Sequence, residues 1–467
     1  MGAEGWSVLE WLALAEHELL LFAAVFFLIG TLDEFAMDLA WGWLKLTGRA
    51  KTATLSRKDL KHRRLAGRAA VLIPAWHESQ VIADTLRHAL AAWEQEDLRI
   101  YVGVYRNDPA TLEAAAIGAA CDPRVRIVVH DRTGPSTKAD CLNRLFRALQ
   151  QDELREGCPA RMVVLHDAED MVDPAALAVL DAEMDHSQFV QLPVLPVPQA
   201  SSRWVGSHYC EEFAEAHGKA MVVRDALGTS LPAAGVGCAF DRQMLDRLAR
   251  AGSSEGPFDE DSLTEDYELG LRVAAAGGKS RFLRLRGEDG QLIATRAYFP
   301  HELDKSVKQK ARWMHGIALQ GWDRLGWSGG PAEWWMRLRD RRGPLSALVL
   351  LTGYLLLALT LVIVALDLAG FSTGWQPSPL LMALVTLNLA SFAWRAVMRF
   401  GFTCAEYGWR EGVMAVLRIP VANAVAIMAG YRALYAYARS LRGEAPQWEK
   451  TAHDRHPARK VTLEWAS

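Results

Sequence analysis

The sequence lacks the short motifs that mark several common classes of protein. None of its six cysteines forms a CxxC pair, so neither a zinc site nor a disulfide framework is indicated. It has no GxxxxGK followed by Ser or Thr and no GxGxxG, and so gives no sign of a P-loop ATPase or a dinucleotide enzyme. The net charge is -3 and no domain is strongly basic, which argues against nucleic acid as the main partner.

Apolar runs long enough to span a bilayer lie toward the two ends of the chain. The first covers residues 19–32. Residues 1–18 contain no Lys or Arg and no small-residue cleavage site follows, so a membrane anchor is favoured over a signal peptide. Residues 345–366 are uncharged and long enough to cross about 30 Å of hydrocarbon. Residues 379–398 form a third run.

A fourth apolar run, residues 412–438, is less regular because it contains Arg418 and Pro420. Both of its flanks are basic, and a segment with cytoplasmic signals on both sides should not span. We therefore expect an interfacial or re-entrant helix, with an ordinary fourth span as the alternative.

The charges around these runs predict their orientation. Basic residues gather in 45–68 and 337–342, whereas only Asp367 is charged between the second and third runs. The excess of Lys and Arg on cytoplasmic loops places the middle of the chain inside and the loop 367–378 outside. The expected layout is a transmembrane anchor (1–44), a basic cytoplasmic linker (45–68), a cytoplasmic catalytic-type domain (69–330), a membrane region with two spans and the interfacial helix (331–440), and a cytoplasmic tail (441–467).

The middle of the chain alternates between strand and helix patterns, which predicts an α/β fold with a mainly parallel sheet covered on both faces. The expected strands are 69–76, 99–105, 125–130 and 161–167, and the expected helices are 79–93, 109–120 and 138–150. Ligands of such sheets bind beyond the carboxyl ends of the strands, where polar residues follow the apolar runs.

Four acidic residues follow the last of these strands in VVLHDAEDMVDP, residues 163–174. Asp167 and Glu169 are two apart and would point the same way on an extended chain, which suits Mg2+ or Mn2+ bridging phosphates. A solvated acidic loop is the alternative. Asp173 precedes Pro174, and we expect it to be the N-cap of the next helix.

Four segments together resemble the membrane-embedded family 2 glycosyltransferases of the processive type, which include cellulose and hyaluronan synthases. They are IPAWHES (73–79), DAE (167–169), TED (264–266) and QKARW (309–313). The resemblance spans about residues 70–440 and implies a GT-A nucleotide-sugar-binding domain. HDAED, LTEDYELG and WEKTAH (448–453) are similar to the narrower phage-adsorption type of inner-membrane glycosyltransferase.

The resemblance implies that Asp266 is the general base that deprotonates the acceptor hydroxyl. The neighbouring Glu265 is a second catalytic candidate, although Ser262 and Glu265 also fit a capping box, which would make Glu265 structural. An unpaired acid in the first turn of a helix is also mildly stabilising, which is the alternative for Asp266.

QKARW is expected to be helical, so that Gln309, Arg312 and Trp313 share one face. Arg312 would neutralise the leaving diphosphate and Trp313 would stack on an acceptor sugar. The alternative is that both residues only anchor the domain at the membrane interface. Gly235 and Gly237, in GVGCAF, resemble the glycine loop on the acceptor side; they would permit close backbone approach or simply make a turn.

The resemblance also implies a donor-binding set at the strand ends. Its members are Pro74, Ala75, Glu78, Asn107, Asp108, Lys138 and Asp140. Lys138 would contact a phosphate, or would be a solvated residue at a helix start. YRND stands where the family commonly has VDDGS, so the choice between Asn107 and Asp108 as the nucleotide contact stays open.

These patterns predict an inverting, metal-dependent and processive glycosyltransferase of the bacterial inner membrane. Its donor would be a UDP-sugar, with a UDP-N-acetylhexosamine favoured by the resemblance, and its other partners the growing glycan and the lipid bilayer. Three spans are few for a polymer channel, so a dimer or an outer-membrane or periplasmic export partner would complete the path. The alternatives are a single-addition transferase that makes a lipid-linked sugar and a non-enzymatic phage receptor or export component.

Overall fold

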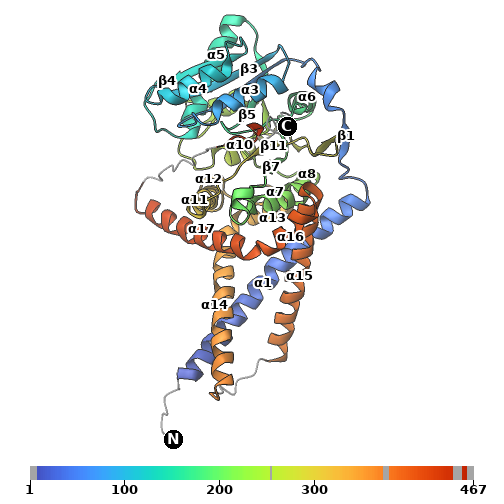
Figure 1. Cartoon of the computed structure of the whole chain (residues 1–467), viewed down its shortest axis with the longest axis vertical. Helices are drawn as coiled ribbons and strands as arrows, with labels where there is room; N and C mark the ends of the chain where they lie inside the picture. The colour runs from blue at the N-terminus through green and yellow to red at the C-terminus, as the bar shows by residue number, and fades with distance from the viewer. Residues whose placement is uncertain (1–7, 253–254, 372–377, 445–454, 460–467) are drawn as a thin grey trace.

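A computed structural model describes residues 8–252, 255–371, 378–444 and 455–459. An α/β domain stands on a stalk of three long helices, and shorter helices lie across the junction between them (Figure 1). The tail motif at 448–453 and residues 372–377 of the loop 367–378 lie outside the described residues.

The main sheet of the α/β domain has the strand order β4-β3-β2-β5-β8-β6-β9. β8 runs antiparallel to β5 and β6, and the other neighbours are parallel, as the sequence predicted for most of the sheet. The strands are β2 (Arg68–Pro74), β3 (Leu98–Tyr105), β4 (Val125–His130), β5 (Ala160–Leu165), β6 (Phe189–Gln191), β8 (Cys238–Asp241) and β9 (Ser280–Phe282).

Helices cover both faces of this sheet because alternate strand residues point to opposite sides. On β2, Val71 and Ile73 pack into one core together with Leu86, whereas Leu72 packs into the other together with Phe146. The first face is covered by α3 (Ile82–Ala92), α4 (Pro109–Ala119) and α6 (Ala176–Glu183), and the second by α5 (Lys138–Glu156), α9 (Arg242–Ala251) and α10 (Glu265–Ala275).

Two short parallel ladders extend the domain. β1 (Ala53–Leu55) pairs with β10 (Leu285–Gly287), and β7 (Val194–Pro196) pairs with β11 (Thr295–Ala297). An antiparallel bridge between Met171 and Arg296 joins β11 to the loop that follows β5. This bridge ties the acidic segment predicted as a site to the far part of the domain.

Within the described ranges, three helices are long and apolar enough to cross a membrane: α1 (Val8–Leu46), α14 (Gly343–Leu368) and α15 (Pro379–Tyr407). α1 contacts both of the others, and polar pairs join it to α15, including Thr31 with Ser391 at 2.8 Å and Asn388 with the Ala24 carbonyl at 3.0 Å. Figure 1 shows the three extending from the same side of the α/β domain.

α16 (Trp409–Leu417) and α17 (Ile419–Ser440) are joined with a 52° bend at the position of the fourth apolar run. In Figure 1, α17 runs across the base of the α/β domain rather than alongside the three stalk helices. It packs through Ala429 and Ala433 against α11 (Leu303–Met314). The crosswise course agrees with the expected interfacial helix, although the pair is also apolar enough for a broken span.

Ion pairs cluster where the α/β domain meets the stalk. Arg339, on α13 (Pro331–Arg341), and Arg342, the N-cap of α14, both pair with Asp33 and Glu34 of α1. Lys219 of the α/β domain pairs with Asp38 of α1 at 2.7 Å. Glu34, Asp38 and Lys219 are buried and the other three are partly buried, and buried charges are tolerated where they are paired. The junction therefore holds the base of the domain in a defined position over the helices.

Candidate active site

The acidic segment forms a turn immediately after β5. The Asp170 amide donates to the Asp167 carbonyl at 3.3 Å, and Ala168 and Glu169 form the turn between them. Our expectation that Asp167 and Glu169 share one side of an extended chain was therefore wrong in its geometry, because the chain stops being a strand at Leu165. Asp167 instead pairs with Lys138, with Nζ to Oδ1 at 2.5 Å.

Asp170 lies behind this turn and was not assigned a role from sequence. It is buried, and its Oδ2 accepts from the Asp167 amide at 3.0 Å and lies 2.8 Å from Nδ1 of the buried His166. Burial raises the pKa of the Asp170 carboxyl, and the His166 contact opposes that shift. The spacing of His166 and Asp170 is the only sequence signal that could have suggested the pair.

Asp173 also departs from its predicted role. α6 begins at Ala176 with Ala175 as its N-cap, so Asp173 lies two residues before the N-cap position. Its carboxylate accepts from the Ala175 amide at 3.0 Å and pairs with Arg57 at 3.1 Å. Asp173 is therefore paired with a residue far away in the chain, Arg57, which no local sequence pattern predicts.

The predicted base, Asp266, lies in the first turn of α10. Its side chain is half-buried, and Oδ1 accepts from the Tyr267 amide at 2.7 Å. The other oxygen faces the glycine loop, where an ideal β-carbon on Gly235 would meet Oδ2 at 2.1 Å. Gly235 therefore allows a close approach to the loop backbone, and the group that approaches it is the carboxylate of Asp266.

Glu265 does not form the capping box that we considered. Ser262 donates to Glu268 at 2.7 Å, and Thr264 caps α10 without a side-chain hydrogen bond. The box fails because Ser262 precedes the N-cap by two residues, which puts Glu268 rather than Glu265 within its reach. Glu265 instead faces the site, and burial, together with the nearby Asp266 charge, raises its pKa to about 7.

Lys138 is the cation at the centre of this group. Burial alone would lower its pKa, but the carboxylates of Asp167, Glu265 and Asp266 outweigh burial and hold the pKa well above its usual range. Three segments predicted separately, at the start of α5, after β5 and at the start of α10, therefore meet within electrostatic reach of one ammonium group.

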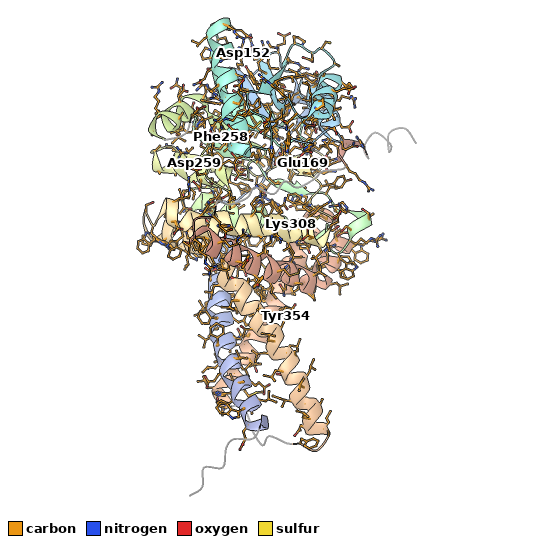
Figure 2. The ribbon with its side chains drawn as sticks, turned by 90° about the vertical axis from the view of Figure 1, so that its left-hand side faces the viewer. Asp152, Glu169, Phe258, Asp259, Lys308 and Tyr354 are labelled. Atoms are coloured by element: carbon orange, nitrogen blue, oxygen red, sulfur yellow. The ribbon has the colours of Figure 1, made fainter. Side chains whose placement is uncertain are left out.

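QKARW lies on α11, as predicted, at the side of the domain nearest the stalk (Figure 2 labels Lys308 on this helix, below Glu169). Arg312 is close enough to lower the pKa of Glu265, although burial prevails there. Among the described residues, neither Nε of Arg312 nor Oε1 of Gln309 has a hydrogen-bond partner, and both atoms are buried. Buried groups of this kind are expected to meet a ligand or water.

Trp313 closes an aromatic cluster beside Arg312. Its ring centroid is 6.2 Å from Tyr209, 6.3 Å from Phe213 and 6.4 Å from Phe299, in edge-on arrangements. Such a surface can hold one face of a sugar ring by stacking. The alternative role, simple anchoring at the membrane interface, does not require this cluster.

The remaining donor-side residues mostly hold loops together. Asn107 exchanges two hydrogen bonds with the Gly134 backbone, at 2.7 and 2.8 Å, and Asp108 accepts from the amides of His77 and Thr111. The buried Asp140 lies 3.3 Å from His130. Pro74 is the last residue of β2, and Ala75 and Glu78 lie in the loop that follows it, at the carboxyl end of the strand. Direct contact of this set with a nucleotide stays a prediction.

The acidic turn has the donor types that a hard divalent cation requires. Within the described parts of the chain, no group of three His, Cys, Asp or Glu residues is arranged to hold a metal. Two carboxylates with further oxygen ligands from phosphate and water are the usual environment of Mg2+ in nucleotide sites. Asp167 and Glu169 supply two carboxylates of this chemical type, and their joint binding of a metal stays a prediction. A metal bound at Asp167 would replace its pairing with Lys138.

Comparison with known proteins places this geometry. Residues 66–316, more than half of the chain, match the family described as glycosyltransferase like family 2. The chain belongs to glycosyltransferase family 2. The predicted family and α/β fold class are thereby confirmed, and the matched segment contains Asp167, Lys138, Asp266 and Arg312.

Two curated relatives share 32% identity with the chain over 456 residues. They are bacteriophage adsorption protein B of Escherichia coli strain K12 and bacteriophage N4 adsorption protein B of Escherichia coli O157:H7. The alignment covers 92% of this chain but 61% of each relative. The resemblance to the phage-adsorption type is thus confirmed over most of the chain, whereas the chain spans about three-fifths of those proteins.

Solved structures give more distant likenesses. A mannosyltransferase from Pyrobaculum calidifontis in complex with GDP-mannose and Mn2+ is 17% identical, with a TM-score of 0.49, over 92% of this chain and 99% of that one. Glucosyl-3-phosphoglycerate synthase from Mycobacterium tuberculosis, with Mn2+, UDP and phosphoglyceric acid, is also 17% identical, with a TM-score of 0.35, over 59% of this chain and 83% of that one. Neither likeness assigns a substrate.

Proposed function

We propose that this chain is an inverting, processive glycosyltransferase of the bacterial inner membrane that extends a surface or secreted polysaccharide from a UDP-sugar. The observation that carries the proposal is that Lys138, Asp167, Glu265 and Asp266 meet beside Arg312. Arg312 lies on α11, which packs against α17 at the base of the α/β domain. A UDP-N-acetylhexosamine is favoured as donor by the family resemblance.

In this proposal Asp266 accepts the proton of the acceptor hydroxyl as that oxygen attacks the sugar carbon and the nucleoside diphosphate leaves. Arg312 and Lys138 bring the positive charge that the departing diphosphate requires. Asp167 and Glu169 would hold Mg2+ or Mn2+, which supplies further charge neutralisation at the diphosphate when bound. Asp266 thus acts on the acceptor hydroxyl, whereas Arg312 and Lys138 act on the leaving diphosphate.

The acceptor would lie on Trp313 and its aromatic neighbours, between Asp266 and the junction with the stalk. This placement supports processive synthesis, because a product leaving the base would meet the helices next. It also supports a cytoplasmic catalytic domain, since the basic segments predicted to lie inside adjoin it. A dimer or an export partner would complete a path that three helices leave open.

The test is release of UDP by the purified full chain in detergent with Mn2+, with each common UDP-sugar supplied separately. Asp266→Asn is the variant that should abolish release, because the amide cannot take the proton. A ladder of products from the wild-type reaction supports a polymerase, and a single product supports the single-addition alternative. If folded wild-type protein released UDP from no donor, the proposed donor class would be wrong.

A further inference from the structure

The acidic segment after β5, residues 166–173, contains the turn that would hold the metal. Hydrogen bonds to the backbone carbonyls of this segment hold it in place. Three of these bonds come from one helix, α3, and the residue that follows it. The donor and acceptor residues are Thr85 with Ala168, His88 with Val172, and Trp93 with Asp173. The bond from Thr85 reaches the carbonyl between the two candidate metal ligands, so α3 acts as a fixed support for the turn.

The Asp170 carbonyl is held from a different part of the chain. His456 Nε2 lies 3.1 Å from this oxygen, and the Ala458 amide donates to His456 Nδ1 at 3.2 Å. Because Nδ1 accepts a hydrogen bond, the proton of the neutral ring is on Nε2, which therefore donates to Asp170. His456 is 1% exposed, and burial lowers its pKa to about 4, so the ring is neutral at neutral pH.

Arg459 fastens the same segment to the start of α3. Its guanidinium pairs with Asp84 and donates to the Gln80 carbonyl at 2.7 Å. Residues 455–459 therefore contact both the acidic turn and the helix that supports it. In Figure 1 this short segment lies against the α/β domain, away from the end of α17.

We propose that His456 is a positioning residue for the metal-binding turn. Its target, Asp170, also accepts the Asp167 amide through its carboxylate, so the main chain and the side chain of one residue link His456 to the first candidate ligand. The C-terminal segment thereby completes the support that α3 begins. This inference rests on the proposed metal-dependent transfer.

The expected consequence is a loss of metal affinity when His456 is removed. Partners that orient metal ligands without touching the metal typically contribute about 10- to 100-fold in metal affinity. We expect His456→Ala to weaken Mn2+ binding about tenfold. His456→Gln keeps an N–H donor and should recover part of the loss, and Arg459→Ala should weaken binding by a smaller factor because it loosens the segment from α3.

The measurement is Mn2+ binding by the full chain in detergent with UDP and no sugar donor, read from the free Mn2+ signal in electron paramagnetic resonance. Arg455→Ala is the matched control, since this residue is exposed in the same segment. Thermal unfolding of each variant separates lost affinity from lost fold, and Arg459→Ala retains a test if His456→Ala does not fold.

The outcomes distinguish this inference from the proposed function. Weaker binding in His456→Ala and Arg459→Ala, with Arg455→Ala equal to wild type, supports the positioning role. Unchanged Mn2+ affinity in folded His456→Ala, beside tight binding by wild type, overturns it and leaves the proposed function standing. Absence of Mn2+ binding by wild type with UDP overturns the metal site and, with it, this inference.

Discussion

The carboxylate of Asp266 occupies the space that a side chain at Gly235 would need. An ideal β-carbon on Gly235 would stand 2.1 Å from Oδ2 of Asp266, far inside van der Waals contact. Gly235 also has φ of +75°, in the left-handed region that favours glycine. The position of the proposed base is therefore set by a residue on the other side of the site, across a gap that admits no methyl group.

Gly235→Ala should displace Asp266 and lower kcat strongly, by at least roughly a hundredfold, because misplaced catalytic groups lose that order of rate. UDP release with saturating donor measures the effect. Gly228→Ala is the matched control: Gly228 has φ of +65° but open space around its missing β-carbon. It shares the backbone strain of about 1–2 kcal/mol that Ala meets at positive φ, without the clash. Equal loss in both variants would assign the effect to strain.

Lys138→Met should tighten Mn2+ binding severalfold while lowering kcat by roughly a hundredfold. The first effect is expected because Lys138 pairs with Asp167 at 2.5 Å and would compete with a metal for that carboxylate. The second follows from losing a positive charge at the diphosphate. Titration of Mn2+ and initial rates measure the two effects separately. Lys279→Met, at an exposed lysine, should change neither. Weaker Mn2+ binding in Lys138→Met would contradict Asp167 as a ligand.

Glu265→Gln should reduce the loss of stability on going from acid to neutral pH. The folded pKa of Glu265 is about 7 against an ordinary 4.5, because burial and Asp266 disfavour its charge. A raised pKa means that the folded protein holds the proton more tightly, so this stabilisation is present below pH 4.5 and is lost as the pH rises to 7. The change is about 3 kcal/mol.

The melting temperature between pH 4.5 and pH 8 tests this expectation in detergent. Wild type should lose more stability across the interval than Glu265→Gln. Glu288→Gln, at an exposed carboxyl, should follow the wild-type curve. Parallel curves for wild type and Glu265→Gln would show that Glu265 ionises normally.

Arg418→Met should destabilise the chain by about 3–5 kcal/mol, since it removes the hydrogen-bonded partner of a buried carboxylate and leaves only the more distant Arg399, at 3.8 Å. Arg418 and Glu211 are both fully buried, 2.9 Å apart, where the α16–α17 bend meets α7 (His208–Glu215). Adding Glu211→Gln should restore part of the loss. Arg439→Met, at a half-exposed pair with Glu444, should cost less than about 1 kcal/mol. Chemical unfolding in detergent gives the comparison.

The strands and helices of the domain were predictable because each buries one or two faces with its own period. β2, β3, β4 and β5 lie within two residues of their predicted limits, and α11 is helical as QKARW suggested. The motifs could be recognised in the sequence for a similar reason, because Asp167, Asp266 and Arg312 each belong to a short local pattern. The limits of the domains themselves stay a prediction.

The partners of the acidic residues were not predictable in the same way. Asp173 pairs with Arg57, Ser262 bonds Glu268, and Asp170 is buried with His166. Each choice depends on where distant segments pack and on how much water remains around a charge, which no local spacing records. Burial then raises the pKa of Glu265, and the missing β-carbon of Gly235 leaves the space that Asp266 occupies.

By itself, then, the amino-acid sequence determined the alternation of strands and helices, the apolar helices and the types of chemical group available, since periodicity and composition are local properties. Tertiary structure alone decided which of four acids faces Lys138, which carboxylate lies against Gly235, and that His456 reaches the acidic turn. Those contacts join residues far apart in the chain, and only the packed sheet brings them within hydrogen-bonding distance.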